Sequence, residues 1–532
     1  MSGAGEWGHT LPPEQMTGDV AHALAEADAP RHSDTTPREW VKDNLFTNWY
    51  SGLFTIVFST VALVLAFFTA RFVFATGQWE PVRVNLELFM VGRFPREERD
   101  RLVINLLLYA GAAGLGIGWT RARARDRAIL AGTPYVKSEP RELLSSYWAL
   151  AAFVLALMIV GVRTIGPWLL LAGAIVAFAV GFVCASRAPR SLRATTLSLA
   201  GLVGVAGFLT LSGTHGFAWI FLTLALIPVM FDVIGRGSDR LPDAVGWVAA
   251  IVTMTVAGFL VVDRGLNVFT VLVVALACVA FVACGIGNAA TSVQIGSLAI
   301  VAVATWQIGE ALDVGNIDWI EWGGLYMNLV ASVAAIVLAF PLGLLLALGR
   351  RSSLPVVRWM CTVYIEIIRG VPLITLLLMA RFFLGFFLDT DNPLSLPTRA
   401  IAAITLFSAA YIAEIVRGGL QAVPRGQTEA GQALGLGAPA ITRLLVLPQA
   451  LRAVIPAMVG QFISLFKDTT LLFIIGVLEF LGVRDVVHAQ AEFQNVGIAE
   501  TLVFVAFGFW AISFTMSRES QRLERLLGIG TR

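Results

Sequence analysis

Charged side chains interrupt a long apolar run near the C-terminus of this chain. Lys467 and Asp468 fall inside the apolar segment 455–480. Gln461 and Ser464 precede them in the same segment. On a helix Gln461, Ser464 and Asp468 lie roughly on one face, which we expect to point to protein or water because polar groups facing lipid are costly. Three interpretations stay open: an ion pair within the helix or at a subunit interface, contact with a polar solute, or a helix that begins later and leaves Lys467 near the cytoplasmic end.

A second pair of opposite charges lies earlier in the chain, at the end of another apolar segment. Glu414 and Arg417 stand three residues apart, so on a helix their side chains can form an ion pair. Such a pair more often supports its own helix than lines a path for solute. Both residues are therefore candidates for a translocation path or an interface, with local helix support as the simpler interpretation.

The stretch Gln427–Gln449 is polar and rich in glycine, although it lies between two apolar segments. Thr428 is expected to cap a short helix, which places Glu429 in the first turn, where a carboxylate suits the positive end of the helix dipole. Gly435 can supply a turn at positive φ that ends this helix. The pattern predicts a helix-turn-helix that is too small to bury a core of its own.

Small apolar residues give the first of these two short helices a face that another backbone can approach closely. Its members, at spacings of three and four, are Ala430, Ala433 and Leu434. On the second helix, four residues are expected to share one side: Ile441, Leu444, Leu445 and Pro448. We interpret the pair as a docking element on the cytoplasmic surface of a membrane protein.

The same residues resemble a known signature, that of the permease subunits of ABC importers: E-A-A, three residues, Gly, nine residues, then Ile-x-Leu-Pro. The chain matches it at five positions: Glu429, Ala430, Gly435, Leu447 and Pro448. Gly431 stands in place of the second Ala and Leu445 in place of the Ile. In that family the loop fits a groove on the ATPase subunit, so the resemblance assigns these five residues to ATPase coupling.

The resemblance extends beyond the signature and implies a function. The flanking sequence over about 325–520 looks like the polar amino-acid branch of the family, and 40–125 more weakly resembles the M-type permease of general L-amino-acid importers. The resemblance implies amino-acid uptake driven by ATP on a separate ATPase subunit, with a second permease subunit and an extracytoplasmic amino-acid-binding protein as partners. Region 130–310 is an enlargement without a motif, and an ATP-independent carrier or sensor that uses these extra helices is the alternative.

Composition defines the fold class. The chain of 532 residues is 57% hydrophobic and 14% charged, against about one quarter charged in soluble domains. Many apolar runs of about 17–25 residues indicate an all-α polytopic membrane protein with about 14 transmembrane helices. The predicted spans include those near 195–211, 217–234, 268–284, 290–308 and 371–388. The resemblance implies that the last five form a type I (MetI-like) permease core. The predicted regions are a disordered cytoplasmic tail 1–45, a multi-helix membrane region 46–310, a permease domain 320–520 with coupling loop 424–448, and a cytoplasmic C-terminus 517–532.

Arginines mark the loops that we expect in the cytoplasm. They place Arg125, Arg190 and Arg350 inside, whereas an acidic loop places Asp391 outside. Counting spans from these loops predicts a protein of the cell (inner) membrane. Both termini and the Glu429 loop are then expected on its cytoplasmic side. The Arg125 cluster borders an apolar span, which disfavours nucleic-acid binding.

Several kinds of chemistry have no support in the sequence. Only three basic residues are lysines, and none follows a glycine, so the chain lacks a Walker A Gly-Lys and its own ATPase site. The four cysteines have no Cys-x-x-Cys spacing, and no His-Glu-x-x-His pattern occurs. We therefore expect no enzyme activity, no metal and no cofactor. The family resemblance implies that ATP is bound by the partner subunit.

Overall fold

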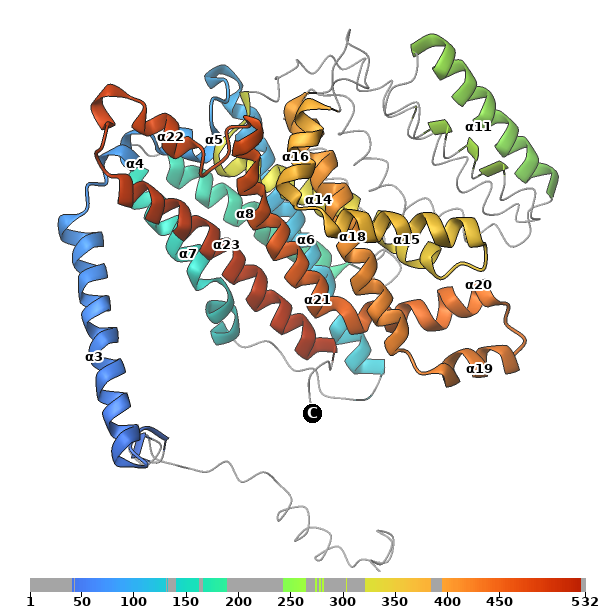
Figure 1. Ribbon diagram of the computed structural model, residues 1–532, viewed down its shortest axis with the longest axis horizontal. Helices are drawn as coiled ribbons and strands as arrows, with labels where there is room; N and C mark the ends of the chain where they lie inside the picture. The colour runs from blue at the N-terminus through green and yellow to red at the C-terminus, as the bar shows by residue number, and fades with distance from the viewer. Residues whose placement is uncertain are drawn as a thin grey trace, which may run out of the picture. The chain divides into compact units, whose positions relative to one another are not determined.

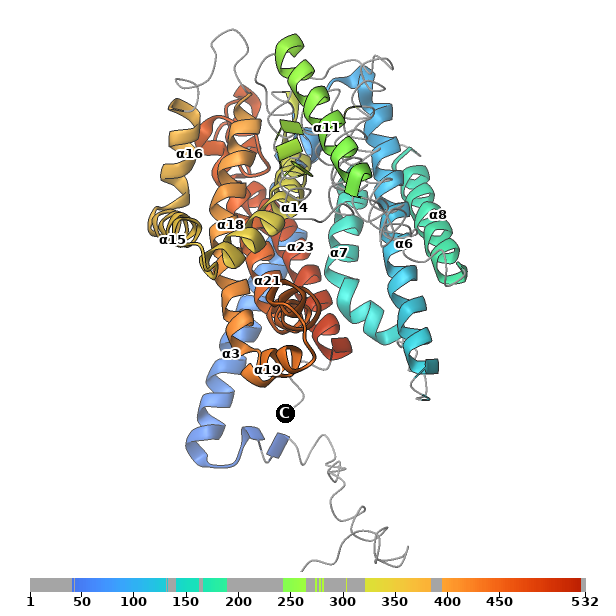
Figure 2. The same ribbon diagram turned by 90° about the vertical axis from the view of Figure 1, so that its right-hand side faces the viewer.

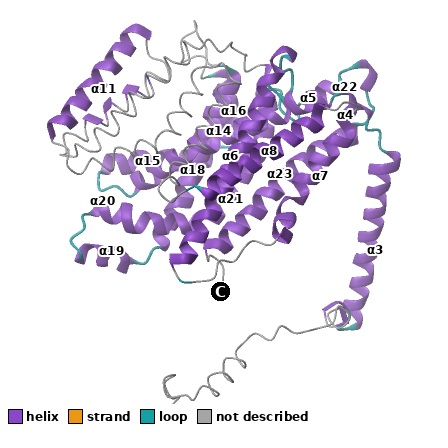
Figure 3. Cartoon of the chain, turned by 180° about the vertical axis from the view of Figure 1, so that it is seen from behind, coloured by secondary structure: helices purple, strands orange, loops and turns teal. Residues whose placement is uncertain are grey.

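Helices joined by loops make up the part of the chain that the structure, a computed structural model, describes (Figures 1 and 3). Described are residues 41–42, 44–130, 132, 140–161, 166–188, 243–264, 321–383 and 395–527, with seven scattered residues between 265 and 320. Among them the only β-type pairing is an isolated bridge between Gly324 and Glu479. Contacts divide the chain into two compact units, Met1–Gly77 and Gln78–Arg532.

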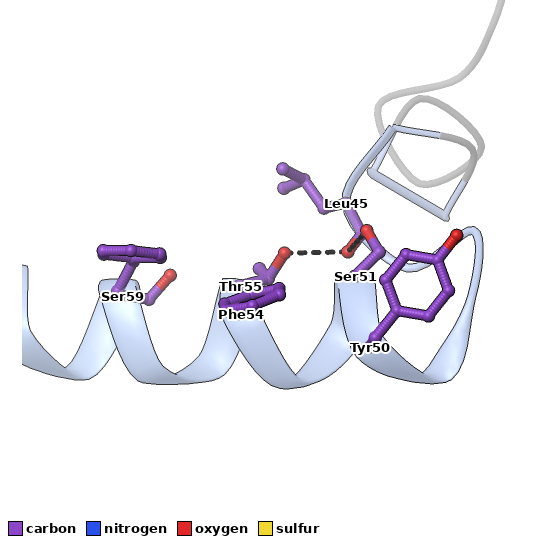
Figure 4. A pocket seen from close by; sticks show the side chains of 7 residues that line it. Leu45, Tyr50, Ser51, Phe54, Thr55 and Ser59 are labelled. Atoms are coloured by element: carbon purple, nitrogen blue, oxygen red, sulfur yellow. Dashed lines mark hydrogen bonds between the residues drawn. The ribbon is translucent and has the colours of Figure 1, made fainter.

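Unit 1 contains one long helix. α3 (Trp49–Arg71) continues into a π turn, η2 (Phe72–Thr76). None of the 23 residues of α3 is buried, and the helix is apolar on all sides, as expected of a segment surrounded by lipid. The hydroxyls of Ser51 and Thr55 donate to the carbonyl oxygen of Leu45 at 3.1 and 2.8 Å. These bonds fold the preceding segment back on the helix and form a small apolar hollow there (Figure 4).

Unit 2 contains the remaining helices. Its N-terminal part comprises α4 (Glu80–Val84), α5 (Leu86–Val91), α6 (Arg99–Leu130), α7 (Pro140–Gly161), α8 (Gly166–Arg187) and α11 (Asp243–Arg264). Its C-terminal part comprises α14 (Gly324–Arg350), α15 (Pro355–Gly370), α16 (Leu373–Phe382), α18 (Leu396–Ala422), α19 (Arg425–Ala433), α20 (Ala438–Ile441), α21 (Leu447–Asp468), α22 (Val483–His488) and α23 (Ile498–Leu527).

Seven helices among the described residues are long and apolar enough to cross a membrane, or eight if α15 and α16 form one bent span. The expected count of about 14 is not confirmed. Predicted spans near 195–211, 217–234 and 290–308, and most of 268–284, lie outside the described residues, as do Arg190 and Asp391. The span predicted at 371–388 differs from the structure, because α16 begins at Leu373 and follows α15 with a bend of 102°.

Small residues let α14, α18 and α21 pack closely. A side chain at Gly343 of α14 would come within 2.8 Å of the carbonyl oxygen of Ala409, and one at Gly419 of α18 within 2.6 Å of that of Ala450. Gly and Ala at helix contacts allow this approach in membrane proteins. The packed helices fix the end of α18 and the start of α21, between which α19 and α20 lie.

The helices upstream of residue 310 share a core with the C-terminal part. Phe89 of α5 and Phe153 of α7 are buried in one cluster with Phe480 and with Phe504 of α23. The rings of Phe89 and Phe504 meet edge to face at 5.4 Å. The regions predicted on either side of 310–320 are therefore parts of one compact unit, and the division of the chain by contacts falls at Gly77.

Four helices of unit 2 run in the same direction, and a fifth runs in the opposite direction, which matters for the site. The C-terminal ends of α6, α14, α18 and α23 lie on the side of the unit where α19 lies, whereas α21 starts there and runs back (Figures 1 and 2). Arginine occurs at these ends, including Arg125 and Arg350. The structure thus places these arginine-bearing ends on the same side of unit 2 as α19.

Candidate functional site

The predicted helix-turn-helix is present, but its first helix starts earlier than expected. α19 begins at Arg425 after Pro424, and the amide of Gln427 donates to the carbonyl oxygen of Pro424 at 3.0 Å. Thr428 is therefore an interior residue of α19 and not its cap, and Glu429 lies beyond the first turn, so both predictions are wrong. The reason is that Pro424 itself marks the helix start, since proline fits the beginning of a helix and not its interior.

Gly435 ends α19 through a Schellman motif. Its φ is +74°, and its amide donates to the carbonyl oxygen of Gln432 at 2.9 Å. The amide of Leu436 donates to the carbonyl oxygen of Gly431 at 3.1 Å, which completes the pair of bonds that defines the motif. Nothing lies within 4 Å of a Cβ at Gly435, so backbone conformation alone favours glycine there.

Gly431, where the chain departs from the signature, is the contact between the two short helices. It is buried, and a Cβ there would come within 2.9 Å of side-chain atoms of both Ile441 and Leu445. The prediction that four residues share one side of the second helix is only partly correct. Ile441 is buried, whereas Leu444 is 61% exposed and Pro448 is exposed. A π turn over Thr442–Val446 shifts the helical phase between these residues.

The expected docking face is open in this chain. Glu429, Ala430 and Ala433 are exposed, and Leu434 is 78% exposed, which is high for a leucine. Leu447 and Pro448, the remaining signature residues, form the first turn of α21. The Nε2 of Gln449 donates to Oε1 of Gln427 at 3.1 Å and joins the base of α21 to α19.

Glu414 and Arg417 form the expected pair, and the structure adds residues that the sequence did not reveal. The Nε of Arg417 donates to Oε2 of Glu414 at 2.9 Å. Arg350 of α14 lies 3.3 Å from Glu414 and 2.8 Å from Glu366 of α15, and Arg369 lies 3.7 Å from Glu414. Two carboxylates and three guanidinium groups thus join the ends of α14, α15 and α18 next to α19. The three ion pairs of Arg350 and Arg369 join residues that are 16 to 64 positions apart in sequence, so local spacing could not reveal them.

Lys467 and Asp468 are the last two residues of α21. The helix begins at Leu447, earlier than the expected 455, so Lys467 lies at the end remote from α19 and the interpretation with a later start is wrong. No ion pair joins Lys467 to Asp468 in the described chain, because adjacent helical residues point about 100° apart. Gln461 and Asp468 are half-buried and Ser464 is exposed; their contact with a solute or another subunit stays a prediction.

A buried polar cluster lies near that far end of α21, and the sequence analysis did not detect it. Glu479 is fully buried and accepts hydrogen bonds from the amides of Leu481 and Gly482 at 2.9 and 2.6 Å. The side-chain amide of Asn328 donates to Glu479 at 3.1 Å and to Thr469 at 3.0 Å. The available signal was Asn328, a polar residue in the otherwise apolar start of α14. Burial raises the pKa of Glu479 from 4.5 to about 7.

Comparisons with known proteins find relatives of the part of the chain that contains this site. Residues 339–527 match the family described as the binding-protein-dependent transport system inner membrane component, a range that includes α18 to α21. The glutamate/glutamine/aspartate/asparagine transport system permease protein BztC of Rhodobacter capsulatus is 40% identical over 318 residues, which are 58% of this chain and 72% of that protein.

Two further similarities cover shorter parts of the chain. The inner membrane amino-acid ABC transporter permease protein YhdY of Escherichia coli K12 is 44% identical over 211 residues, 40% of this chain and 57% of that protein. A crystal structure of an amino acid ABC transporter with histidines is 30% identical and covers 38% of this chain and 91% of that one, with a TM-score of 0.35. BztC and YhdY give no support to the alternative of an ATP-independent carrier or sensor. The chain belongs to the family of binding-protein-dependent inner-membrane transport components, among the polar amino-acid ABC importer permeases.

Proposed function

We propose that this chain is the membrane-spanning permease subunit of an importer that takes up amino acids, driven by ATP hydrolysis on a separate subunit. The observation that supports the proposal most directly is the exposed α19–α20 pair, fixed at Gly435 and placed between α18 and α21 within the matched region. A short exposed helix is marginal by itself, so its exposed apolar face suits a partner. The ATPase subunit is the partner that the family implies.

The proposed orientation follows from the arginine-bearing helix ends. Both termini and α19 face the cytoplasm, where the ATPase subunit docks on Glu429 and the Ala430–Leu434 face. An extracytoplasmic binding protein delivers the amino acid at the opposite side, and a second permease subunit completes the path. The face formed by Gln461, Ser464 and Asp468 is the proposed contact for solute or for the second subunit. Amino acids with acidic or amide side chains are the first substrates to test, because BztC is named for them.

The ion-pair cluster around Glu414 is proposed to transmit movement of α19 to the bundle. It joins α14, α15 and α18 at the helix ends nearest α19. Arg351 adds a further link, since its Nη1 donates to the carbonyl oxygen of Leu420 at 3.3 Å. A pull on α19 would therefore reach three helices and not α18 alone.

The test uses the backbone requirement at Gly435. In Gly435→Val, a β-branched residue must adopt the left-handed conformation, which costs roughly 1–2 kcal/mol. We expect ATPase retention on the purified complex to fall by about tenfold and uptake into vesicles to be lost, while membrane insertion stays normal. Gly435→Asn should retain most function, because asparagine tolerates this conformation.

The matched control is Gly426→Val. Gly426 lies in α19, and a Cβ there also meets nothing within 4 Å, but its φ is not positive. We expect near-normal ATPase retention in this variant. Full retention and uptake in Gly435→Val would refute the coupling assignment, as would equal losses in the two valine variants.

A further inference from the structure

Helices α6 and α8 form a tightly joined pair. A Cβ at Gly114 would overlap the carbonyl oxygen of Phe178, and one at Gly118 would lie 2.5 Å from that of Phe182. A Cβ at Gly181 would likewise overlap the carbonyl oxygen of Gly111. The contact positions increase together in both helices, so α6 and α8 run parallel with their C-terminal ends on the same side (Figure 2). Backbone contact of this kind fixes the two ends relative to each other.

Arginine side chains crowd the joined ends. α6 carries Arg121, Arg123 and Arg125 in its last turns, and α8 ends at Arg187. Arg123, Arg125 and Arg187 are exposed, and in the described part of the chain no ion pair involves these three residues. This arginine patch of Arg123, Arg125 and Arg187 therefore carries positive charge that the described part of the chain leaves without an ion pair.

Aromatic rings hold two of these guanidinium groups at the membrane boundary. The guanidinium carbon of Arg121 lies 5.2 Å from the ring centre of Phe182 across the helix pair, and that of Arg123 lies 5.0 Å from the ring of Trp119. Both helices are candidate spans, Leu102–Leu130 and Leu169–Arg187, so their ends lie near the headgroup layer. Tryptophan is typical of that layer.

We propose that the joined ends of α6 and α8, with Arg121, Arg123, Arg125 and Arg187, bind the phosphate headgroup of an anionic phospholipid. The planar guanidinium group matches phosphate with two parallel hydrogen bonds, and clusters of arginine beside a membrane span attract anionic lipids. The glycine contacts supply a preformed spacing between the arginines of the two helices. The proposal concerns the helices outside the family match at 339–527 and gives this region a lipid-binding role independent of ATPase coupling.

The first experiment measures lipid retention on the purified full chain by native mass spectrometry, with phosphatidylglycerol or phosphatidylcholine added. The wild type is expected to retain phosphatidylglycerol in preference to phosphatidylcholine. Arg125→Gln with Arg187→Gln should lower this retention by roughly 25-fold, since each arginine near an anionic surface contributes about a factor of five. Retention equal to that of the wild type would overturn the proposal.

A control variant and a crosslinking experiment distinguish a defined lipid site from non-specific attraction of anionic lipid to positive charge. Arg358→Gln with Arg425→Gln removes two exposed arginines elsewhere in unit 2 and should leave retention unchanged; an equal loss would contradict a defined patch. A photoactivatable phosphatidylglycerol on the wild-type chain, which needs no variant to fold, should crosslink to peptides that contain 119–125 or 182–187. Crosslinks confined to other peptides would overturn the assignment.

Discussion

The buried carboxyl group of Glu479 makes the stability of this chain depend on pH in an unusual direction. Burial raises its pKa from 4.5 to about 7, and the group lies in the loop between two candidate spans. We therefore consider Glu479→Gln, because glutamine stays uncharged and is close in shape to the protonated acid. Asn328 and Leu481 donate to Oε2 of Glu479 and Gly482 donates to Oε1, so the single oxygen of glutamine can keep the first two bonds, whereas its NH2 group, a donor, loses the bond from Gly482 at every pH.

Proton linkage gives the direction and the size of the pH-dependent change in the free energy of unfolding. A carboxyl with a raised folded-state pKa binds its proton more tightly in the folded chain, so its contribution to the free energy of unfolding is complete below pH 4.5. That contribution is lost as the pH rises to about 7. A rise of roughly 2.5 pH units corresponds to a loss of about 3 kcal/mol. Between pH 4.5 and 7.5 the free energy of unfolding of the wild type should fall by this amount relative to that of Glu479→Gln, because the cost of the lost Gly482 bond in the variant does not change with pH.

Denaturant unfolding of the purified chain in detergent micelles, followed by tryptophan fluorescence at several pH values, measures this difference. Glu492→Gln is the matched control, because Glu492 is an exposed acid in the same segment. The control should follow the wild-type pH profile. Parallel profiles of wild type and Glu479→Gln over this range would refute the reasoning, since they would show that Glu479 does not change its protonation between pH 4.5 and 7.5.

Three other outcomes are expected. Glu414→Gln leaves three arginines near one another without their shared carboxylate. Because the Glu414 side chain is 24% exposed, we expect a loss of roughly 1–3 kcal/mol of unfolding free energy. An unchanged unfolding free energy would show that the cluster does not stabilise the bundle. Neutralising Lys467 and Asp468 together should give the sum of the single effects on stability, because they form no pair within the chain; recovery in the double variant would show pairing across a subunit interface. An impermeant thiol reagent should label Glu492→Cys from outside and Arg125→Cys only after the membrane is opened, and the reverse pattern would overturn the proposed orientation.

Local features of this site were predictable from the sequence for a definite physical reason. The positive φ of Gly435 was predicted correctly, because a turn between two short helices requires a conformation that only glycine adopts freely. The pair Glu414–Arg417 was predictable because residues three apart on a helix are neighbours. Thr428 shows the limit: several nearby residues could begin the helix, and Pro424 does.

What the sequence by itself determined is the helical, membrane-spanning class and the short motif between Pro424 and Pro448, since both depend on composition and on preferences of neighbouring residues. Only the tertiary structure decided which distant residues meet. Asn328 reaches Glu479 across 151 positions, and Arg350 reaches Glu414 across 64. The close contact between Gly431 and Ile441 has the same origin. Helix packing brings residues together by their shape and their distance in space, and spacing along the chain does not encode either.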